Sequence, residues 1–175
     1  MAELEIQTDR LRTRPLHAVL DDPDARAGLF RDLRSVLTPR VLAPLPPALH
    51  MGQTPIADWL AMRMAESEVH TIALRETNAT VGLLILARAP GESEQPPTLH
   101  IGYLLGEDVW GLGLATELLW GLITELGTQA PLRLMGGVGT NNPASARVLE
   151  KVGFRRDTAL STDDTVIFTL DLGQR

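Results

Sequence analysis

The chain has 175 residues, of which 44% are hydrophobic and 22% are charged, a composition typical of a folded domain rather than a disordered chain. Acidic residues outnumber basic ones by 22 to 16, and the formal charge of −6 disfavours nucleic acid as a main partner. The sequence has no cysteine, no apolar run long enough to span a bilayer and no secretory signal at its start. We therefore expect a single domain over residues 1–175, located in the cytoplasm and not bound to a membrane.

The first third of the chain is predicted to be mainly helical. Apolar residues recur at helical spacing from Leu16 to Leu37, with a break near residues 21–24, and again from Ile56 to Glu66. Five prolines between these two regions predict a long loop from Thr38 to Pro55.

The remaining two thirds are predicted to contain most of the sheet. Apolar and alternating patterns predict strands over residues 69–75, 81–87, 99–105, 132–138 and 165–172, with a loop at 89–97. Leucines at every fourth position predict a helix from Leu114 to Leu126, and a second helix is predicted from Pro143 to Val152. Strands that precede a β-α-β-α unit and a closing strand indicate a mixed α/β sheet, not a repeating doubly wound one.

The segment from Gly106 to Thr116 is predicted to bind phosphate. It joins a strand to the most regular helix, and its glycines permit a tight turn that presents main-chain N–H groups at the helix N-terminus. A Walker A loop is excluded because Leu112 stands where the lysine is needed. A dinucleotide fingerprint is also excluded, because Thr116 takes the third small position and no acidic residue follows about twenty residues later.

Three stretches of the sequence resemble the GNAT acetyltransferases. Residues 110–115, Trp-Gly-Leu-Gly-Leu-Ala, resemble the family's pyrophosphate loop, Gln/Arg-x-x-Gly-x-Gly/Ala, with Trp110 in the Gln/Arg place. Residues 142–154 match Asn-x-x-Ser-(x5)-Lys-x-Gly-Phe, and residues 8–16 are similar to a first strand. All three patterns are typical of the branch that acetylates ribosomal-protein N-termini, the RimJ/RimL-like enzymes.

The resemblance implies a fold and a cofactor. The fold is α/β, with a central, mixed, mostly antiparallel sheet of about seven strands flanked by about four helices. The cofactor is acetyl-CoA, whose pyrophosphate lies on the main-chain N–H groups of the loop and whose pantetheine arm lies between the fourth and fifth strands. The implied cofactor-binding residues are Leu112, Gly113, Leu114, Ala115, Thr116 and Asn142.

Two residues are candidates for proton transfer. Many GNAT enzymes carry a tyrosine two residues before the motif lysine to protonate the departing thiolate, but Leu149 stands there, and the RimL-like pattern implies Ser145 instead. His100 takes the place of a glutamate in the branch pattern Glu-x-Gly-Tyr, and its ordinary pKa near neutrality suits it to accept the amine proton. Tyr103, on the opposite face of the strand by alternation, is expected to pack. No histidine pair has metal-ligand spacing, so no metal is expected.

The expected activity is transfer of an acetyl group from acetyl-CoA to a primary amine. The acceptor is either a protein N-terminal α-amine or a small amine such as an antibiotic or polyamine, bound near Thr38–Pro55. About one α-amine in ten is neutral at pH 7, against roughly one lysine in 2,500, so a histidine base suits the former. A CoA-binding sensor or interaction domain without turnover is the alternative, because Leu149 and His100 depart from the family pattern. The sequence is compatible with a homodimer.

Overall fold

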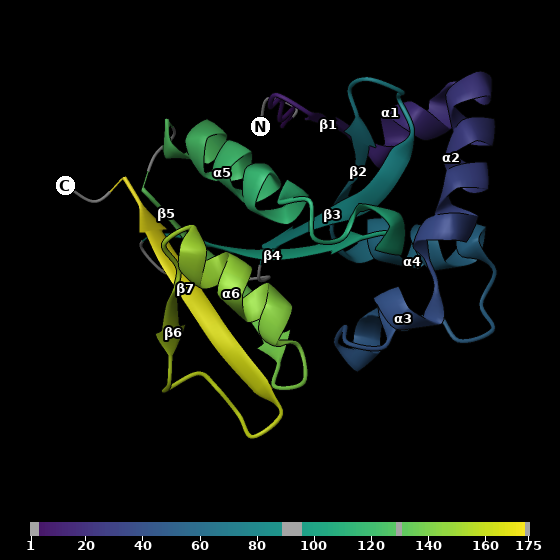
Figure 1. Cartoon of the computed structure of the whole chain (residues 1–175). Helices are drawn as coiled ribbons and strands as arrows, with labels where there is room; N and C mark the ends of the chain where they lie inside the picture. Colours follow the sequence, from purple (N-terminus) through teal and green to yellow (C-terminus); the bar gives the residue numbers. More distant parts are fainter. Residues whose placement is uncertain (1–3, 89–95, 129–130, 174–175) are drawn as a thin grey trace.

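In the part of the chain that the structure describes, seven strands form one sheet with helices on both faces (Figure 1). The computed structural model describes residues 4–88, 96–128 and 131–173. The strands are β1 (Leu11–Pro15), β2 (Glu68–Leu74), β3 (Thr80–Arg88), β4 (Thr98–Leu105), β5 (Leu132–Gly139), β6 (Arg155–Asp157) and β7 (Thr165–Leu172). Their order is β1-β2-β3-β4-β5-β7-β6, and every neighbouring pair is antiparallel except β4 and β5. The mixed, mostly antiparallel sheet expected from the sequence is confirmed.

The parallel pair β4–β5 is short, and the two strands separate beyond it. Their register covers only Thr98 to His100 on β4, the last pair being His100 with Met135. Further along, β4 stays paired with β3 as far as Leu105, and β5 stays paired with β7 as far as Gly139. The sheet therefore opens between Ile101–Leu105 and residues 136–139, where β4 and β5 no longer pair with each other.

The described residues contain six α-helices, whereas about four were expected. They are α1 (Leu16–Asp21), α2 (Pro23–Val36), α3 (Pro39–Leu42), α4 (Ile56–Glu66), α5 (Leu114–Gly127) and α6 (Pro143–Lys151), with 3₁₀ turns η1 (Pro47–Leu49) and η2 (Glu107–Val109). The extra helices arise because Asp22 and Thr38 cap new helices, each followed by a proline at the first helical position. The segment predicted as a loop from Thr38 to Pro55 therefore contains α3 and η1.

Each face of the sheet has its own core. On one face the buried leucines of α5, at 114, 118, 122 and 126, pack with Leu149 of α6 and with Leu84 and Ile101 of the sheet. On the other face α1, α2 and α4 pack against Leu83, Ile85 and Leu104. Because successive side chains of a strand point to opposite faces, His100 lies on the α1–α4 side and Tyr103 on the α5–α6 side.

Residues Pro44–Leu49, which we call the strap, are fixed beside the opening in the sheet. The indole Nε1 of Trp59 donates to the carbonyl of Leu49 at 3.2 Å, and Nη1 of Arg63 donates to the carbonyl of Ala48. Both donors come from α4 and both side chains are buried. The proline-rich segment is thus held against α4 and forms one wall of the region described next.

Candidate active site

The loop before α5 has the geometry of an anion-binding turn. Gly111 and Gly113 adopt φ angles of 73° and 78°, which residues with a side chain rarely adopt. Gly113 is the N-cap of the 14-residue helix α5, and no side chain caps it. The first N–H groups of the helix, those of Leu114, Ala115 and Thr116, have no partner within the helix and carry its positive dipole end.

A groove of about 640 Å³ begins at this loop and runs along α6. Gly113, Leu114, Ala115, Thr116 and Asn142 line it, as the sequence predicts for a cofactor site. Two cations line it as well, Arg147 and the motif lysine Lys151, neither of which was predicted to bind the cofactor. Their i, i+4 spacing on α6 was the available signal. Unbonded N–H groups and cations suit the phosphates of CoA in a protein of charge −6.

Leu112 differs from the other predicted cofactor residues. Its side chain is 55% exposed and does not line the groove. Its carbonyl accepts a hydrogen bond from Nη1 of Arg10 at 3.0 Å. The Leu112 carbonyl therefore connects the loop to the N-terminal segment, and its side chain lies outside the groove.

The N-terminal motif and the loop are joined through Glu117, in the first turn of α5. Glu117 Oε1 accepts from the Thr8 hydroxyl at 2.5 Å and from the Arg10 main-chain N–H at 2.8 Å, and Oε2 accepts from Arg10 Nε at 2.6 Å. Burial alone would raise the pKa of Glu117, but the hydrogen bonds from Thr8 and Arg10 and the charge of Arg10 together lower it. Two sequence motifs about a hundred residues apart therefore form one ionic contact that shapes the loop.

A second contact connects the loop to the helices of the opposite face. Glu107, in η2, accepts from Thr38 at 2.5 Å and from Arg40 at 2.7 Å. The Arg40 guanidinium also lies 5.5 Å from the ring centroid of Trp110, whose Nε1 donates to the Leu105 carbonyl at 2.8 Å. Trp110, which stands in the Gln/Arg place of the family loop, thus makes a cation–π contact with Arg40 at the edge of the groove.

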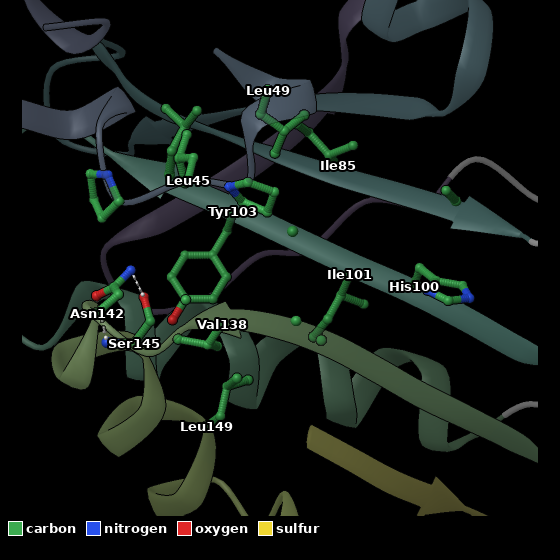
Figure 2. Close-up of a pocket in the computed structure, with 18 residues that line it drawn as sticks. Leu45, Leu49, Ile85, His100, Ile101, Tyr103, Val138, Asn142, Ser145 and Leu149 are labelled. Atoms are coloured by element: carbon green, nitrogen blue, oxygen red, sulfur yellow. Dashed lines mark hydrogen bonds between the residues drawn. The ribbon is translucent and has the colours of Figure 1, made fainter. Parts of the chain in front are cut away.

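The opening between β4 and β5 forms a second, smaller cavity of about 230 Å³ (Figure 2). Its walls are mostly apolar, from the strap, from Ile85 and Ile101 of the sheet, and from Leu149 of α6. Glycines of β5 bring the main chain to the cavity surface; at Gly136 a Cβ would lie 3.6 Å from the Ile101 and Leu149 side chains. The polar side chains among its described lining residues are His100, Tyr103, Asn142 and Ser145.

The two cavities meet at three polar side chains. Tyr103, Asn142 and Ser145 line both the groove and the smaller cavity. Asn142 caps α6, as predicted: its Oδ1 accepts from the Ser145 N–H at 3.3 Å, and its Nδ2 donates to Ser145 Oγ at 3.2 Å. His100 lines only the smaller cavity and lies toward its other end (Figure 2). The structure thus brings Ser145 and Asn142 together and places His100 apart from them.

Tyr103 is the residue at this junction to which the sequence assigned no chemistry. Its ring points toward Asn142 and Ser145 (Figure 2), and its hydroxyl is buried without an aligned hydrogen-bond partner. Burial raises the pKa of Tyr103, and the nearby Ser145 hydroxyl offsets part of that rise. The phenol is therefore protonated at neutral pH. The alternation of side chains along β4 correctly places Tyr103 and His100 on opposite faces of the sheet. It cannot show that the smaller cavity passes through the opened sheet and reaches both residues.

The groove and the small apolar cavity meet where two parallel strands separate, an arrangement suited to a protein that brings two substrates together for group transfer. The chain belongs to the acetyltransferase (GNAT) domain family, whose model matches residues 10–155. Members of this family use acetyl-CoA, and the groove described above fits that molecule's phosphates.

Solved structures agree in fold. A GNAT-family acetyltransferase from Bacillus anthracis is 18% identical, with a TM-score of 0.69 over 95% of this chain and 98% of that one. An acetyltransferase from Agrobacterium tumefaciens is 20% identical, with a TM-score of 0.64 over 97% and 95%. A Vibrio cholerae structure assigned as a ribosomal-protein-serine acetyltransferase is 20% identical, with a TM-score of 0.60 over 95% and 97%. No curated protein matches the chain in sequence. None of the described helices has the length and apolar character needed to cross a membrane.

Proposed function

We propose that this protein is an N-acetyltransferase that moves the acetyl group of acetyl-CoA to a primary amine. The observation that carries the proposal is the junction at Tyr103, Asn142 and Ser145, because a thioester held there would be reached from both cavities. The sensor alternative is not favoured, since the family and the structural neighbours are acetyltransferases. The single domain over residues 1–175, the cytoplasmic location and a homodimer remain predictions.

In this proposal the groove binds acetyl-CoA. The main-chain N–H groups from Leu112 to Thr116, with the Arg147 and Lys151 side chains, would bind the phosphates. Asn142, which lines both cavities, would hold the pantetheine arm. When bound, acetyl-CoA supplies the activated acetyl group, and the protein's residues orient it and move the protons.

The smaller cavity is the proposed acceptor site. Among its described lining residues there is no carboxylate, lysine or arginine. A polyamine or an aminoglycoside needs acidic partners for its several charges, whereas the end of a peptide presents one amine beside a small side chain. We therefore favour a peptide N-terminal α-amine, as in the RimJ/RimL-like branch, with His100 accepting the amine proton directly or through water.

A thiol-release assay tests the proposal directly. Acetyl-CoA is incubated with the protein and one of four acceptor classes: peptides with a free N-terminus, the same peptides with a blocked N-terminus and a lysine, aminoglycosides, and polyamines. We expect CoA release with the free N-terminal peptides and acetylation of their α-amine by mass spectrometry. Acetylation of lysine side chains alone would contradict the α-amine assignment. CoA binding without release for any amine would favour the sensor alternative.

A further inference from the structure

The structure carries an inference about the leaving group that rests on the proposed function. We propose that Tyr103 is the residue that protonates the sulfur of CoA as the thioester breaks, and that Ser145 and Asn142 position it. In the family pattern, the candidate positions for this proton donor are those of Leu149 and Ser145 on the helix. The geometry points instead to a phenol that reaches the same place from strand β4.

The position of the hydroxyl is the first argument. Among the described residues, three polar side chains line both cavities, and Tyr103 is one of them. The reacting thioester must lie where the cavities meet. The Tyr103 oxygen is fully buried and has no aligned hydrogen-bond partner among the described residues. A buried hydroxyl without a partner is costly. The unpaired Tyr103 hydroxyl is explained if it forms a hydrogen bond with a ligand atom when the site is filled.

The second argument is the arrangement of the neighbouring polar groups. Asn142 donates to Ser145 Oγ, which leaves the Ser145 hydroxyl proton to be directed elsewhere. That hydroxyl lies near enough to Tyr103 to affect its titration. If Ser145 donates to the Tyr103 oxygen, the phenol proton is directed into the junction. The three residues then form a short chain that ends at the leaving group.

The third argument is that the other side chains nearby are less suitable. Leu149 carries no acidic proton, and the amide of Asn142 does not ionise near neutral pH. His100 lies toward the other end of the acceptor cavity. A serine hydroxyl is a weaker acid than a phenol, whose pKa is ordinarily about 10. Tyr103 is therefore the strongest acid at the junction.

The proposed step balances as follows. The amine nitrogen bonds to the acetyl carbon, and the carbon–sulfur bond breaks with its electron pair on sulfur. Tyr103 gives its proton to that sulfur, and His100 accepts the proton that the amine loses. A proton then returns to the phenolate through the Ser145 hydroxyl, as His100 releases its proton to solvent. An amine and acetyl-CoA thus become an amide and the CoA thiol, and Tyr103 ends as it began. A thiol ordinarily has a pKa of about 8.5 and a phenol one of about 10, so proton transfer from Tyr103 to the thiolate is unfavourable by itself. The return of a proton to the phenolate completes the transfer.

Replacing the hydroxyl alone is the first test. Tyr103→Phe keeps the ring that packs against the core of the α5–α6 face. We expect kcat to fall by at least about 10²-fold, the low end for a general acid, while the dissociation constant of CoA, measured by calorimetry, stays within about twofold. The double variant with Ser145→Ala should be little slower than Tyr103→Phe, because both groups act in one chain. A Tyr103→Phe enzyme as fast as the parent would overturn the proposal.

Fluorinated tyrosine provides a test that does not depend on the Phe variant folding. Tyr103 is the only tyrosine of the chain, so biosynthetic replacement of tyrosine by a polyfluorinated analogue alters this phenol alone. Fluorine lowers the phenol pKa, and an acid loses activity as the pH rises through its pKa. The alkaline limb of the kcat profile should therefore move to lower pH by the same amount as the pKa read from the phenolate absorbance. An unmoved limb would overturn the assignment.

The fluorine resonance also separates this inference from the proposed function. CoA should shift the ¹⁹F signal of the labelled protein more than an analogue in which hydrogen replaces the thiol, because the sulfur is placed beside the phenol. Equal shifts would overturn the placement of Tyr103. If no amine is acetylated although the signal depends on sulfur, the proposed function fails while the position of Tyr103 stands.

Discussion

The coenzyme groove and the acceptor cavity are built in different ways. The groove starts from one continuous stretch, the loop and first turn of α5, and uses main-chain N–H groups that need only glycine, chain direction and a helix end. The acceptor cavity is assembled from the strap, three strands and α6, which are distant in the sequence. Local motifs therefore reveal the first half of the site, while the second depends on how the sheet opens.

The two halves also differ in electrostatics. The groove has Arg147 and Lys151 on its wall, whereas the described residues of the acceptor cavity contribute no side chain with a permanent charge. If the groove and the acceptor cavity act separately, a substitution in the groove should leave acceptor binding unaltered. A substitution in the acceptor cavity should likewise leave CoA binding unaltered. Only residues at the junction should affect turnover alone. The following predictions test that division, from the largest expected effect to the smallest.

The largest effect is expected from His100. His100→Ala should lower kcat/KM for the acceptor by about 10²-fold, because a general base contributes at least that much. CoA affinity should not change. The control is His17→Ala, an exposed histidine on α1. A variant as active as the parent would remove His100 from the mechanism.

A smaller effect is expected from Ser145 at the junction. Ser145→Ala should lower kcat about tenfold, which corresponds to the loss of one ordinary hydrogen bond, and leave KM for acetyl-CoA nearly unchanged. The effect should be smaller than that of Tyr103→Phe, since Ser145 acts through the phenol. Ser35→Ala, at an exposed position on α2, is the matched control. A rise in KM without a fall in kcat would assign Ser145 to coenzyme binding only.

Glu117 tests how the coenzyme half is held in shape. Glu117→Gln should reduce the free energy of unfolding at pH 7 by about 1 kcal/mol, because the amide replaces only some of the carboxylate's hydrogen bonds. The pKa of Glu117 is lowered in the folded protein, so the carboxylate's contribution is complete above its unfolded pKa of about 4.3. That contribution is lost as the pH falls through the lower, folded value.

The difference in stability between the parent and Glu117→Gln should therefore be constant near neutrality and decline in acid. Chemical denaturation at a series of pH values measures it. Glu125→Gln changes an exposed glutamate on the same helix and serves as the control. A stability difference that persists unchanged at low pH would show that the charge of Glu117 is not what holds the loop.

The smallest effect is expected from the cations of the groove. Arg147→Gln combined with Lys151→Gln should weaken CoA binding about fivefold, since exposed ion pairs are worth at most about 1 kcal/mol each and both side chains are exposed. Added salt should reduce the difference from the parent. The acceptor KM should not change. Arg26→Gln, exposed on α2, is the control, and an equal loss of affinity there would point to a general charge effect.

The motifs and elements predicted from sequence are mostly local features. The strands, the helix from Leu114 and the Asn142 cap could be predicted because each depends on spacing within a dozen residues. The short strand β6 and the helix α3 were missed, since three or four residues carry too little pattern. Residues 89–95, part of a predicted loop, lie outside the described residues.

The sequence by itself determined the family, the phosphate loop and the candidates His100 and Ser145. Only the tertiary structure showed that β4 and β5 part after His100, that Thr8 and Arg10 bind Glu117, and that the Tyr103 hydroxyl lies at the junction with Ser145. The physical reason is that a phosphate loop is made by adjacent main-chain groups. The junction, in contrast, exists only once a strand and a helix about forty residues apart are packed beside the same opening in the sheet.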